Sequence, residues 1–575
     1  MSVTILDPRG AKEITQLHAK RLATIAGKRI ALVSNDMWQA DRALRALAES
    51  LGKHVPQATI VLPDSFPRGN REIDSETLAP ALKALDIDAA ILGNAACGAC
   101  ATATGRAAAR LEEAGIPTVL MTRDTFVDVA RNAFASRGFD QDAALVAFPI
   151  TQFLAGGDLA PISAAAGDFI DGLTRWSPSP GGLGIRGAPP LVIEAAMDNP
   201  LGFVRDANRV LLNNLCGDGL PLYPPTEGLV DWILCGTDLA RHHVVGKIMP
   251  RAGLATIETI AVALAMAGGR PEYLPVLIAA LEALLAPAME HGTAQANSGS
   301  PFPVVIVNGP AARQIRLSSG FGLLGPDPRH PAGACIGRAM RLLLQNVGGA
   351  LPGQGTMAAY GSMRFTNAVF AEADDALPES WLPIACDFGC PAGRNSVTVF
   401  TAVGGVSMPR RAISARDVES EIVNRLHRVA AYMRTPNRDY VVGWATGTPG
   451  GLLISPTVAG QLASLGWPKS KLQRFLWDKA KVTHDVVVAA GLTEWIRSAP
   501  HPRTRAGAID PWPICERPEQ ILVAVAGGDH PSNHFWFPAD APAVSVKSYD
   551  LPSSWDRLIE ESNLELGPGG GACLI

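Results

Sequence analysis

The chain has 575 residues, of which 47% are hydrophobic and 18% are charged, and its formal net charge is −4. A chain this hydrophobic is not wholly disordered, and its length accommodates about three to five domains. The near-neutral charge balance, without basic blocks, argues against nucleic acid as the main partner and against a polybasic membrane tether.

The first 165 residues alternate short apolar segments with helical segments. Predicted strands cover residues 29–34, 58–62, 89–92, 117–121 and 144–148, and predicted helices cover residues 37–51, 101–114 and 124–135. Strands that alternate with helices in this way favour βαβ units and a parallel sheet. We therefore predict a flavodoxin-like domain over residues 1–165, and we expect a fragment of that length to fold by itself.

The rest of the chain predicts one or two further α/β domains. A segment rich in glycine and proline, residues 177–190, leads into a central α/β domain with Gly-rich loops over residues 190–411. A C-terminal α/β domain is expected over residues 412–575. The main elements predicted in these two regions are strands at 304–307, 396–401, 439–442 and 520–526, helical segments at 414–432 and 470–489, and a Gly-rich tail at 567–575.

Residue content also predicts a cytoplasmic protein. Residues 1–20 carry charges throughout and lack the apolar stretch of a signal peptide. The most apolar segment, residues 256–286, is interrupted by Glu258, Arg270 and Glu272, so we expect two buried helices there rather than a membrane span. The 9 cysteines fit reduced thiols better than a disulfide framework.

The strongest local motif is Cys97-Gly98-Ala99-Cys100, between a predicted strand and a predicted helix. Parallel sheets bind ligands at the carboxyl ends of their strands. A thiol at a helix N-terminus is stabilised as the reactive thiolate, and a second cysteine three positions later can resolve a mixed disulfide on the first. Alternatively, the two residues are small buried packing residues or metal ligands.

Three segments around this motif resemble the UGSC-motif (seleno)protein family. They are GKRIALVSN, GNAACGACATATGRAAARLEEAGIPTVLMTRDTF and the strand that ends in Phe148-Pro149. The family motif has selenocysteine or cysteine first, then Gly, Ser and Cys; Cys97, Gly98 and Cys100 match, and Ala99 replaces the serine. The resemblance covers about residues 5–160 and implies thiol or selenol chemistry at Cys97, with Cys100 as its partner.

Two further resemblances, to other groups of proteins, imply no defined substrate. The segment of residues 5–160 is more distantly similar to the selenoprotein B component of glycine, sarcosine and betaine reductases. The segments LATIETIAVALAMAGGRPEYLPVLIAALEA, NGPAARQIRLSSGFGLLGP and CIGRAMRLLLQNVGG resemble long uncharacterised bacterial proteins that carry a UGSC-type domain.

A second close cysteine pair, Cys386 and Cys390, lies ahead of the strand predicted at 396–401. With Cys97 and Cys100 it offers four thiolates, enough for a zinc ion or an iron–sulfur cluster. Such a centre is an alternative; the favoured interpretation requires no cofactor.

Polar residues beyond the motif supply candidates for proton transfer and substrate binding. We expect His242, Asp529 and His530 to move protons. Asp529 and His530 follow a predicted strand, where aspartate and histidine can form an acid–base pair, and the alternative for all three residues is a structural or solvated role. Arginines near Gly-rich turns can hold a carboxylate or phosphate, although the same residues can form structural turns and ion pairs. The predicted substrate-binding residues are Asn94, Asp218, Tyr223, Lys247, Arg270, Asn308, Arg313 and Arg338.

Together these features favour a thiol-dependent enzyme that uses Cys97 as a nucleophilic or redox thiolate on a small anionic substrate. The alternatives are a lyase or hydratase with a cysteine-ligated metal or iron–sulfur centre, and a redox sensor or metal carrier. A thiol reductant and a homo-oligomer are possible partners. We expect the active site to be shared, with the loop at 308–313 or 216–227 close to Cys97.

Overall fold

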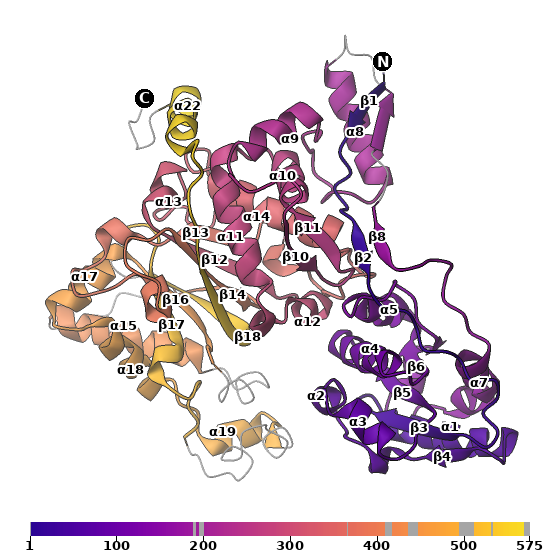
Figure 1. Ribbon diagram of the computed structural model, residues 1–575. Coiled ribbons are helices and arrows are strands. Elements are labelled where there is room, and N and C mark those ends of the chain that lie inside the picture. The colour runs from indigo at the N-terminus through magenta and orange to yellow at the C-terminus, as the bar shows by residue number, and fades with distance from the viewer. Residues whose placement is uncertain are drawn as a thin grey trace.

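The computed structural model describes residues 2–187, 191–194, 200–364, 366–408, 417–434, 447–493, 511–530 and 533–567. These residues form a mixed α/β fold with several sheets (Figure 1). The strand predicted at 439–442 and residues 568–575 of the predicted tail lie outside the described residues.

The N-terminal domain contains a five-stranded parallel sheet in the order β4-β3-β5-β6-β7. This order, in which the second strand lies outside the first, is that of flavodoxin-like folds, as predicted. Its strands are β3 (Arg29–Ser34), β4 (Thr59–Val61), β5 (Ala89–Ala95), β6 (Thr118–Arg123) and β7 (Leu145–Phe148).

Both faces of this sheet are covered, and the apolar residues of its central strands enter a core on each face. In β5, Ala89 and Ile91 enter one core while Ala90 and Leu92 enter the other. One face carries α1 (Ala40–His54), α6 (Ala160–Ala164) and α7 (Ala166–Thr174), and the other carries α2 (Asn70–Ile73), α3 (Leu78–Lys83), α4 (Gly98–Glu113) and α5 (Val127–Ala135). Phe169 and Leu173 of α7 are buried in this core, so the domain extends past the predicted limit at residue 165.

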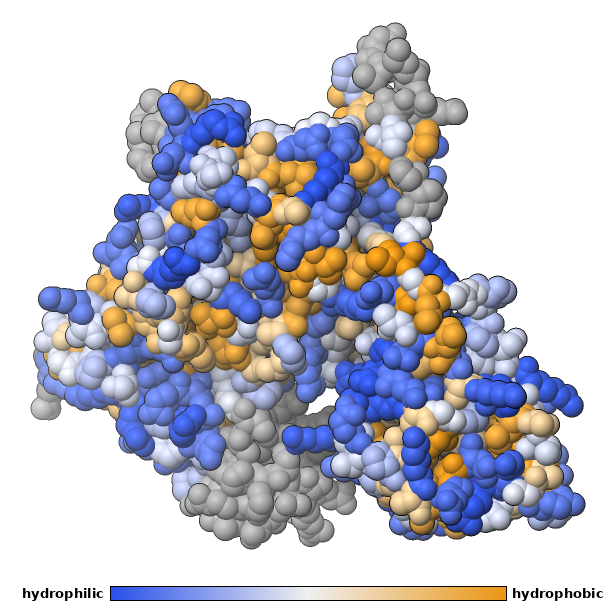
Figure 2. Space-filling view, viewed as in Figure 1, coloured by the Kyte–Doolittle hydropathy of each residue, from blue (hydrophilic) through white to orange (hydrophobic). Residues whose placement is uncertain are grey.

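The first 14 residues belong to other sheets, which also differs from the prediction. Strand β1 (Ser2–Ile5) pairs with β9 (Leu191–Glu194), and β2 (Lys12–Ile14) pairs with β8 (Gly184–Arg186). The sheet of β2 and β8 continues into β11 (Gly253–Thr256) and β10 (Val244–Ile248). The N-terminal domain is therefore inserted between β2 and β8, and Figure 2 shows it as a lobe beside an open gap.

The apolar segment at 256–286 forms two buried helices, as predicted: α10 (Ile257–Met266) and α11 (Leu274–Leu284). Within the described ranges, no single helix has both the length and the apolar character to cross a membrane. One pair, Pro271–Leu284 and Pro287–Ala296, meets both criteria together but is bent by 69°. The other helices of this region are α8 (Pro200–Asn213), α9 (Glu227–Leu234), α12 (His291–Ala296), α13 (Pro310–Gln314) and α14 (Ala332–Leu342).

A seven-stranded sheet joins the central and C-terminal regions, so the boundary predicted at residue 411 falls inside one sheet. The two edge strands of this sheet, residues 368–371 and 521–525, approach each other at one end, where the Ala373 N–H donates to the Val525 carbonyl group at 2.8 Å. Side chains from six strands then share one core, in which Phe370 and Phe537 stack. The strands are β12 (Phe302–Asn308), β13 (Ala368–Ala371), β14 (Ser396–Ala402), β15 (Val406–Met408), β16 (Gly450–Ile454), β17 (Ile521–Val525) and β18 (His534–Ser548).

Helices from the C-terminal region complete the molecule. A further core lies between this sheet and three helices, α15 (Val418–Met433), α17 (Pro456–Ser464) and α18 (Lys469–Lys479). The remaining described helices there are α19 (His484–Ala489) and α22 (Trp555–Leu566).

Candidate functional site

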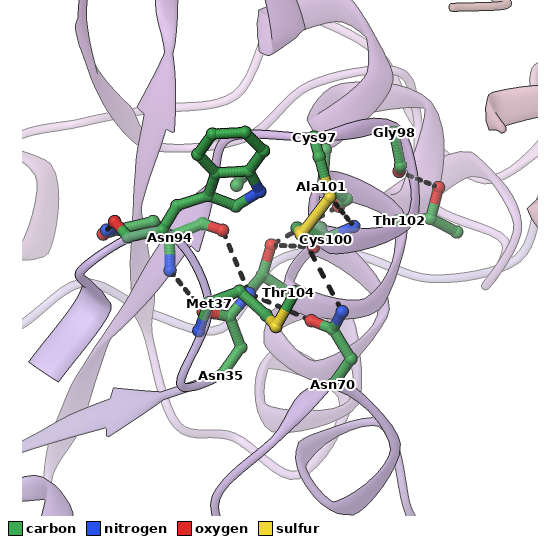
Figure 3. The surroundings of a disulfide bond; sticks show 12 residues. Asn35, Met37, Asn70, Asn94, Cys97, Gly98, Cys100, Ala101, Thr102 and Thr104 are labelled. Carbon is green, nitrogen blue, oxygen red and sulfur yellow. Dashed lines mark hydrogen bonds between the residues drawn. A yellow bond between two sulfur atoms is a disulfide. The ribbon is translucent and has the colours of Figure 1, made fainter. Parts of the chain in front are cut away.

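Cys97 and Cys100 lie where β5 ends and α4 begins, and they form a disulfide with a Cα–Cα distance of 5.0 Å (Figure 3). Cys97 is the N-cap of α4, and its sulfur accepts a hydrogen bond from the Cys100 N–H at 3.2 Å. A helix N-terminus has unpaired N–H groups and a partial positive charge, both of which stabilise a thiolate. The motif was thus correctly placed at a strand-to-helix turn.

The two sulfur-bearing residues differ in exposure. Cys100 is 0% exposed, whereas Cys97 is half-buried and the adjacent Ala99 is exposed. A molecule arriving from solvent therefore reaches Cys97 first. Cys100 is placed to attack the sulfur of Cys97 once a group is bound there, rather than to meet a molecule from solvent itself.

Three asparagines surround the pair from three elements of the domain (Figure 3). The Asn70 side-chain amide donates to the Cys100 sulfur at 3.8 Å, and its oxygen accepts from Asn35 at 2.9 Å. Asn35 in turn accepts the Asn94 N–H at 2.8 Å. Asn94, predicted to bind substrate, is buried and donates to the Trp38 carbonyl group at 2.8 Å, so it shapes this turn.

The CxxC turn also contacts the central region. A Cβ atom on Gly98 would collide with the Ala296 carbonyl group at the end of α12. Apolar side chains from both regions pack together there: Ala95, Ala101, Phe126, Val129, Ala296 and Met357. The loops at 308–313 and 216–227, one of which was expected close to Cys97, have no part in this cluster. The central region instead contacts the CxxC turn through residues 291–297 and Met357.

One cation lies close to this turn. Arg123 follows Thr122, which pairs with Ala95 in the sheet, and its guanidinium lies 5.3 Å from the centre of the Phe126 ring. Within the described part of the chain, Arg123 has no ion-pair partner, and its Nε is buried without a hydrogen bond. It can therefore meet a negative charge brought by a substrate.

Residues 4–167 match the UGSC family model. The N-terminal domain is a UGSC domain. No curated protein and no solved structure matches the chain. The match covers the disulfide, the asparagines and Arg123, but not the residues of the central region that contact the UGSC domain.

The arginines predicted to bind an anion are instead paired with carboxylates. Arg338 forms two hydrogen bonds with Asp218, at 2.7 and 3.0 Å. Arg270 bonds both Glu272 and Glu565 at 2.6 Å. Arg313 bonds Asp375 at 2.6 Å, and both side chains are largely exposed. None of these contacts involves the UGSC domain.

The other predicted residues of the central region are also away from the disulfide. Lys247 pairs with Glu13 at 2.9 Å. His242 is exposed in the turn before β10, and Tyr223 is 62% exposed. Asn308 is buried, and it donates to Glu372 at 2.8 Å and to Asp374 at 2.7 Å.

This buried network holds the edges of the seven-stranded sheet together. Glu372 accepts from Asn308 and from the N–H groups of Ile384 and Val525, at 2.7 and 3.0 Å. Burial raises the pKa of Glu372 to about 7, although Lys469 opposes the shift. Asn308 thus orients a structural carboxyl group.

The four cysteines proposed as metal ligands do not form one site. Cys386 and Cys390 are unbonded to each other and lie near Asp387 in the seven-stranded region. No group of three or more His, Cys, Asp or Glu with the arrangement of a metal site occurs among the described residues. The predicted combination of Cys97, Cys100, Cys386 and Cys390 is therefore wrong.

Asp529 and His530 lie in a separate part of the molecule. His530 lines a cavity at the end of β17, whereas the Asp529 carboxylate accepts a hydrogen bond from the Thr457 hydroxyl group. Asn70, which reaches the disulfide, and Asn35, which bonds Asn70, were not predicted. Asn35 directly follows the strand at 29–34, so the strand-end rule that singled out Asn94 could have found it.

Proposed function

We propose that the protein is an enzyme that reduces a small anionic disulfide through Cys97 and Cys100. The observation that carries this proposal is the pairing of a half-buried Cys97, at the N-terminus of α4, with a fully buried Cys100. Such a pair stores two electrons as a dithiol and releases them on forming its disulfide.

In the reduced protein, the Cys97 thiolate attacks one sulfur of the substrate. A bond forms between Cys97 and that sulfur, the substrate S–S bond breaks, and the first thiolate leaves. The Cys100 thiolate then attacks Cys97 and displaces the second thiolate. The substrate gains two electrons, the Cys97–Cys100 disulfide forms, and a thiol reductant restores the dithiol by the reverse exchange.

The surroundings suit each of these steps. The Cys100 N–H and the first turn of α4 stabilise the attacking thiolate, and Asn70 donates to Cys100. Arg123 supplies a positive charge for an anionic substrate. Residues 296–297 and Met357 border the turn from the central region and limit the approach to Cys97.

The other candidate functions find less support. A lyase or hydratase with a metal bound by both cysteine pairs needs ligands that do not assemble among the described residues. A redox sensor would use the same thiol exchange without repeated turnover. Turnover therefore separates an enzyme from a sensor.

The proposal is tested with 5,5′-dithiobis(2-nitrobenzoate), an anionic aromatic disulfide. Reduced wild-type protein should end with a Cys97–Cys100 disulfide and no adduct on either residue. Cys100→Ser should retain one thionitrobenzoate on Cys97, located by peptide mass spectrometry, and Cys97→Ser should show no fast phase. Cys235→Ser, which removes an exposed thiol, is the matched control.

Turnover is then measured with dithiothreitol as reductant and a small anionic disulfide in excess. An enzyme should accelerate the exchange over many cycles, and Cys97→Ser should abolish the acceleration. A Cys97 that reacts no faster than exposed Cys235 contradicts the proposal. A single oxidation without accelerated turnover supports a sensor instead.

A further inference from the structure

A cavity of about 410 Å³ lies at the edge of the seven-stranded sheet where β16 and β17 end. These two strands are parallel neighbours, and ligands of α/β proteins bind at the carboxyl ends of such strands. Its volume is within the range of small-molecule sites. None of the described residues that line it belongs to the UGSC domain, so it is separate from the disulfide.

The cavity wall combines the sheet with the loop of residues 320–326. Leu453 and Ala526 come from the inner core of the sheet, and Phe535 is held by Phe537 with ring centres 4.7 Å apart. Phe321 is 65% exposed and lies over Gly528. The two are so close that a Cβ atom on Gly528 would collide with the Phe321 ring. Two aromatic rings thus border an opening that leads to aliphatic side chains.

The charge of the lining defines the class of ligand. Among the described residues that line the cavity there is no lysine, arginine, aspartate or glutamate, and the titratable side chains are those of His530 and His534. Ser407 and Asn533 contribute a hydroxyl and a carboxamide group. Ser455 is already engaged: its hydroxyl donates to the His530 carbonyl group at 2.6 Å and caps α17. A few polar groups among apolar and aromatic walls orient a ligand without neutralising a charge.

We infer that this cavity binds an uncharged aromatic small molecule that carries one or two hydrogen-bonding groups. A formal negative charge would find no lysine or arginine in the described lining, where the basic side chains are the imidazoles of His530 and His534, and its desolvation would oppose binding. The aromatic part of the ligand packs between Phe321 and Phe535, and its polar group faces Ser407 and Asn533. This assignment does not depend on the function proposed for Cys97.

The test uses two fluorescent probes with related ring systems and different charge. N-phenyl-1-naphthylamine is uncharged, and 1-anilinonaphthalene-8-sulfonate adds one negative charge. Binding of each to the full-length protein is followed by fluorescence titration. We expect saturable binding of the uncharged probe at one site, and at least about tenfold weaker binding of the sulfonate.

Two variants locate the site. Phe321→Ala removes an exposed wall and should weaken binding of the uncharged probe about fivefold. Ser407→Trp should fill the cavity and abolish binding. Phe388→Ala and Ser464→Trp, which change residues outside the cavity lining, should leave the affinity unchanged, and melting temperatures show that all four variants fold.

Tighter binding of the sulfonate overturns the inference in favour of an anion site. Unchanged affinity in folded Phe321→Ala and Ser407→Trp places the probe elsewhere and also overturns it. Neither result bears on the reactivity of Cys97.

Discussion

Gly98, the first residue of α4, packs directly against the main-chain carbonyl group of Ala296, the last residue of α12. No side chain fits between them. At Gly98, next to Cys97, the CxxC turn of the UGSC domain therefore meets the central region through backbone atoms.

Gly98→Ala should separate the two regions at this point. The added methyl group collides with a main-chain atom that has little freedom to move, so we expect a loss of about 1–3 kcal/mol and faster reaction of Cys97 with iodoacetamide. Gly167→Ala, at a helical glycine with open space around it, is the matched control. Equal behaviour of the two variants in urea unfolding would show that this contact is unimportant.

Asn70→Ala should make the Cys97–Cys100 disulfide harder to reduce. Asn70 donates to the Cys100 sulfur and so stabilises the reduced form, in which that sulfur carries more negative charge. Loss of about 1 kcal/mol of this interaction shifts the reduction potential by about 20 mV to more negative values. Equilibration with glutathione buffers measures the shift. Asn132→Ala in the same domain should leave the potential unchanged.

Glu112→Gln should destabilise the UGSC domain. This buried carboxylate accepts from Arg21 at 2.8 Å and from the Thr118 N–H at 2.7 Å. Burial alone would raise the pKa of Glu112, but the His18 ring, whose Nδ1 lies 3.7 Å from the carboxylate, and the charge of Arg21 outweigh it and hold the pKa below its ordinary value. We expect a loss of about 3 kcal/mol on urea unfolding. The surface variant Glu113→Gln should cost less than about 1 kcal/mol, and similar losses would refute the argument.

His291 should make the central region less stable in mild acid. Burial lowers its pKa from 6.5 to about 4, and its Nε2 accepts the Met249 N–H at 3.0 Å. The unfolded chain therefore takes up the proton first, and stability is lost as pH falls from about 6.5 towards about 4, by about 3 kcal/mol in total.

The measurement compares wild type with His291→Gln, whose amide oxygen can still accept the Met249 N–H. The difference in stability between the two proteins should shrink by about 2 kcal/mol between pH 7 and pH 5. Taking the difference removes the contributions of other groups, including Glu372. A difference that does not change with pH would contradict the role of His291.

A fragment of residues 15–183 should fold by itself, whereas a fragment of residues 1–165 should be much less stable. The shorter fragment lacks α7, so the sheet loses Phe169 and Leu173 from its core at a cost of several kcal/mol. Thermal unfolding followed by circular dichroism compares them, and both contain Cys97. If 1–165 melts as high as 15–183, α7 is not part of the domain.

Local sequence patterns predicted the UGSC domain well, because each of its strands is a short apolar run between breakers and pairs with a strand nearby in the chain. The shared seven-stranded sheet was not predicted. Its centre depends on the pairing of β14 with β18, Ser396 opposite Ser548, and nothing in either strand specifies a partner so distant in sequence. The division at residue 411 therefore followed a change in composition rather than the sheet.

In the candidate site, too, features set by nearby residues were predicted, and features that depend on distant residues were not. Cys97 and Cys100 were recognised because a strand, a turn and a helix fix their environment within a few residues. The pairing of Arg338 with Asp218 was not predicted, because Asp218 lies far away in the sequence and a charged residue does not reveal whether it has an ion-pair partner. Arg123 lies shortly after the strand predicted at 117–121, but its position over Phe126 requires the folded sheet.

The insertion of the UGSC domain between β2 and β8 imposes an order on biosynthesis. Strands β1 and β2 leave the ribosome before the inserted domain, yet their partners β9 and β11 are translated only after the whole of that domain. At about 5–20 residues per second, β2 waits about 12–50 s for β11. During that interval the nascent chain carries unpaired strand edges next to a domain that has had time to fold. These exposed edges are the part of the nascent chain that a chaperone would bind.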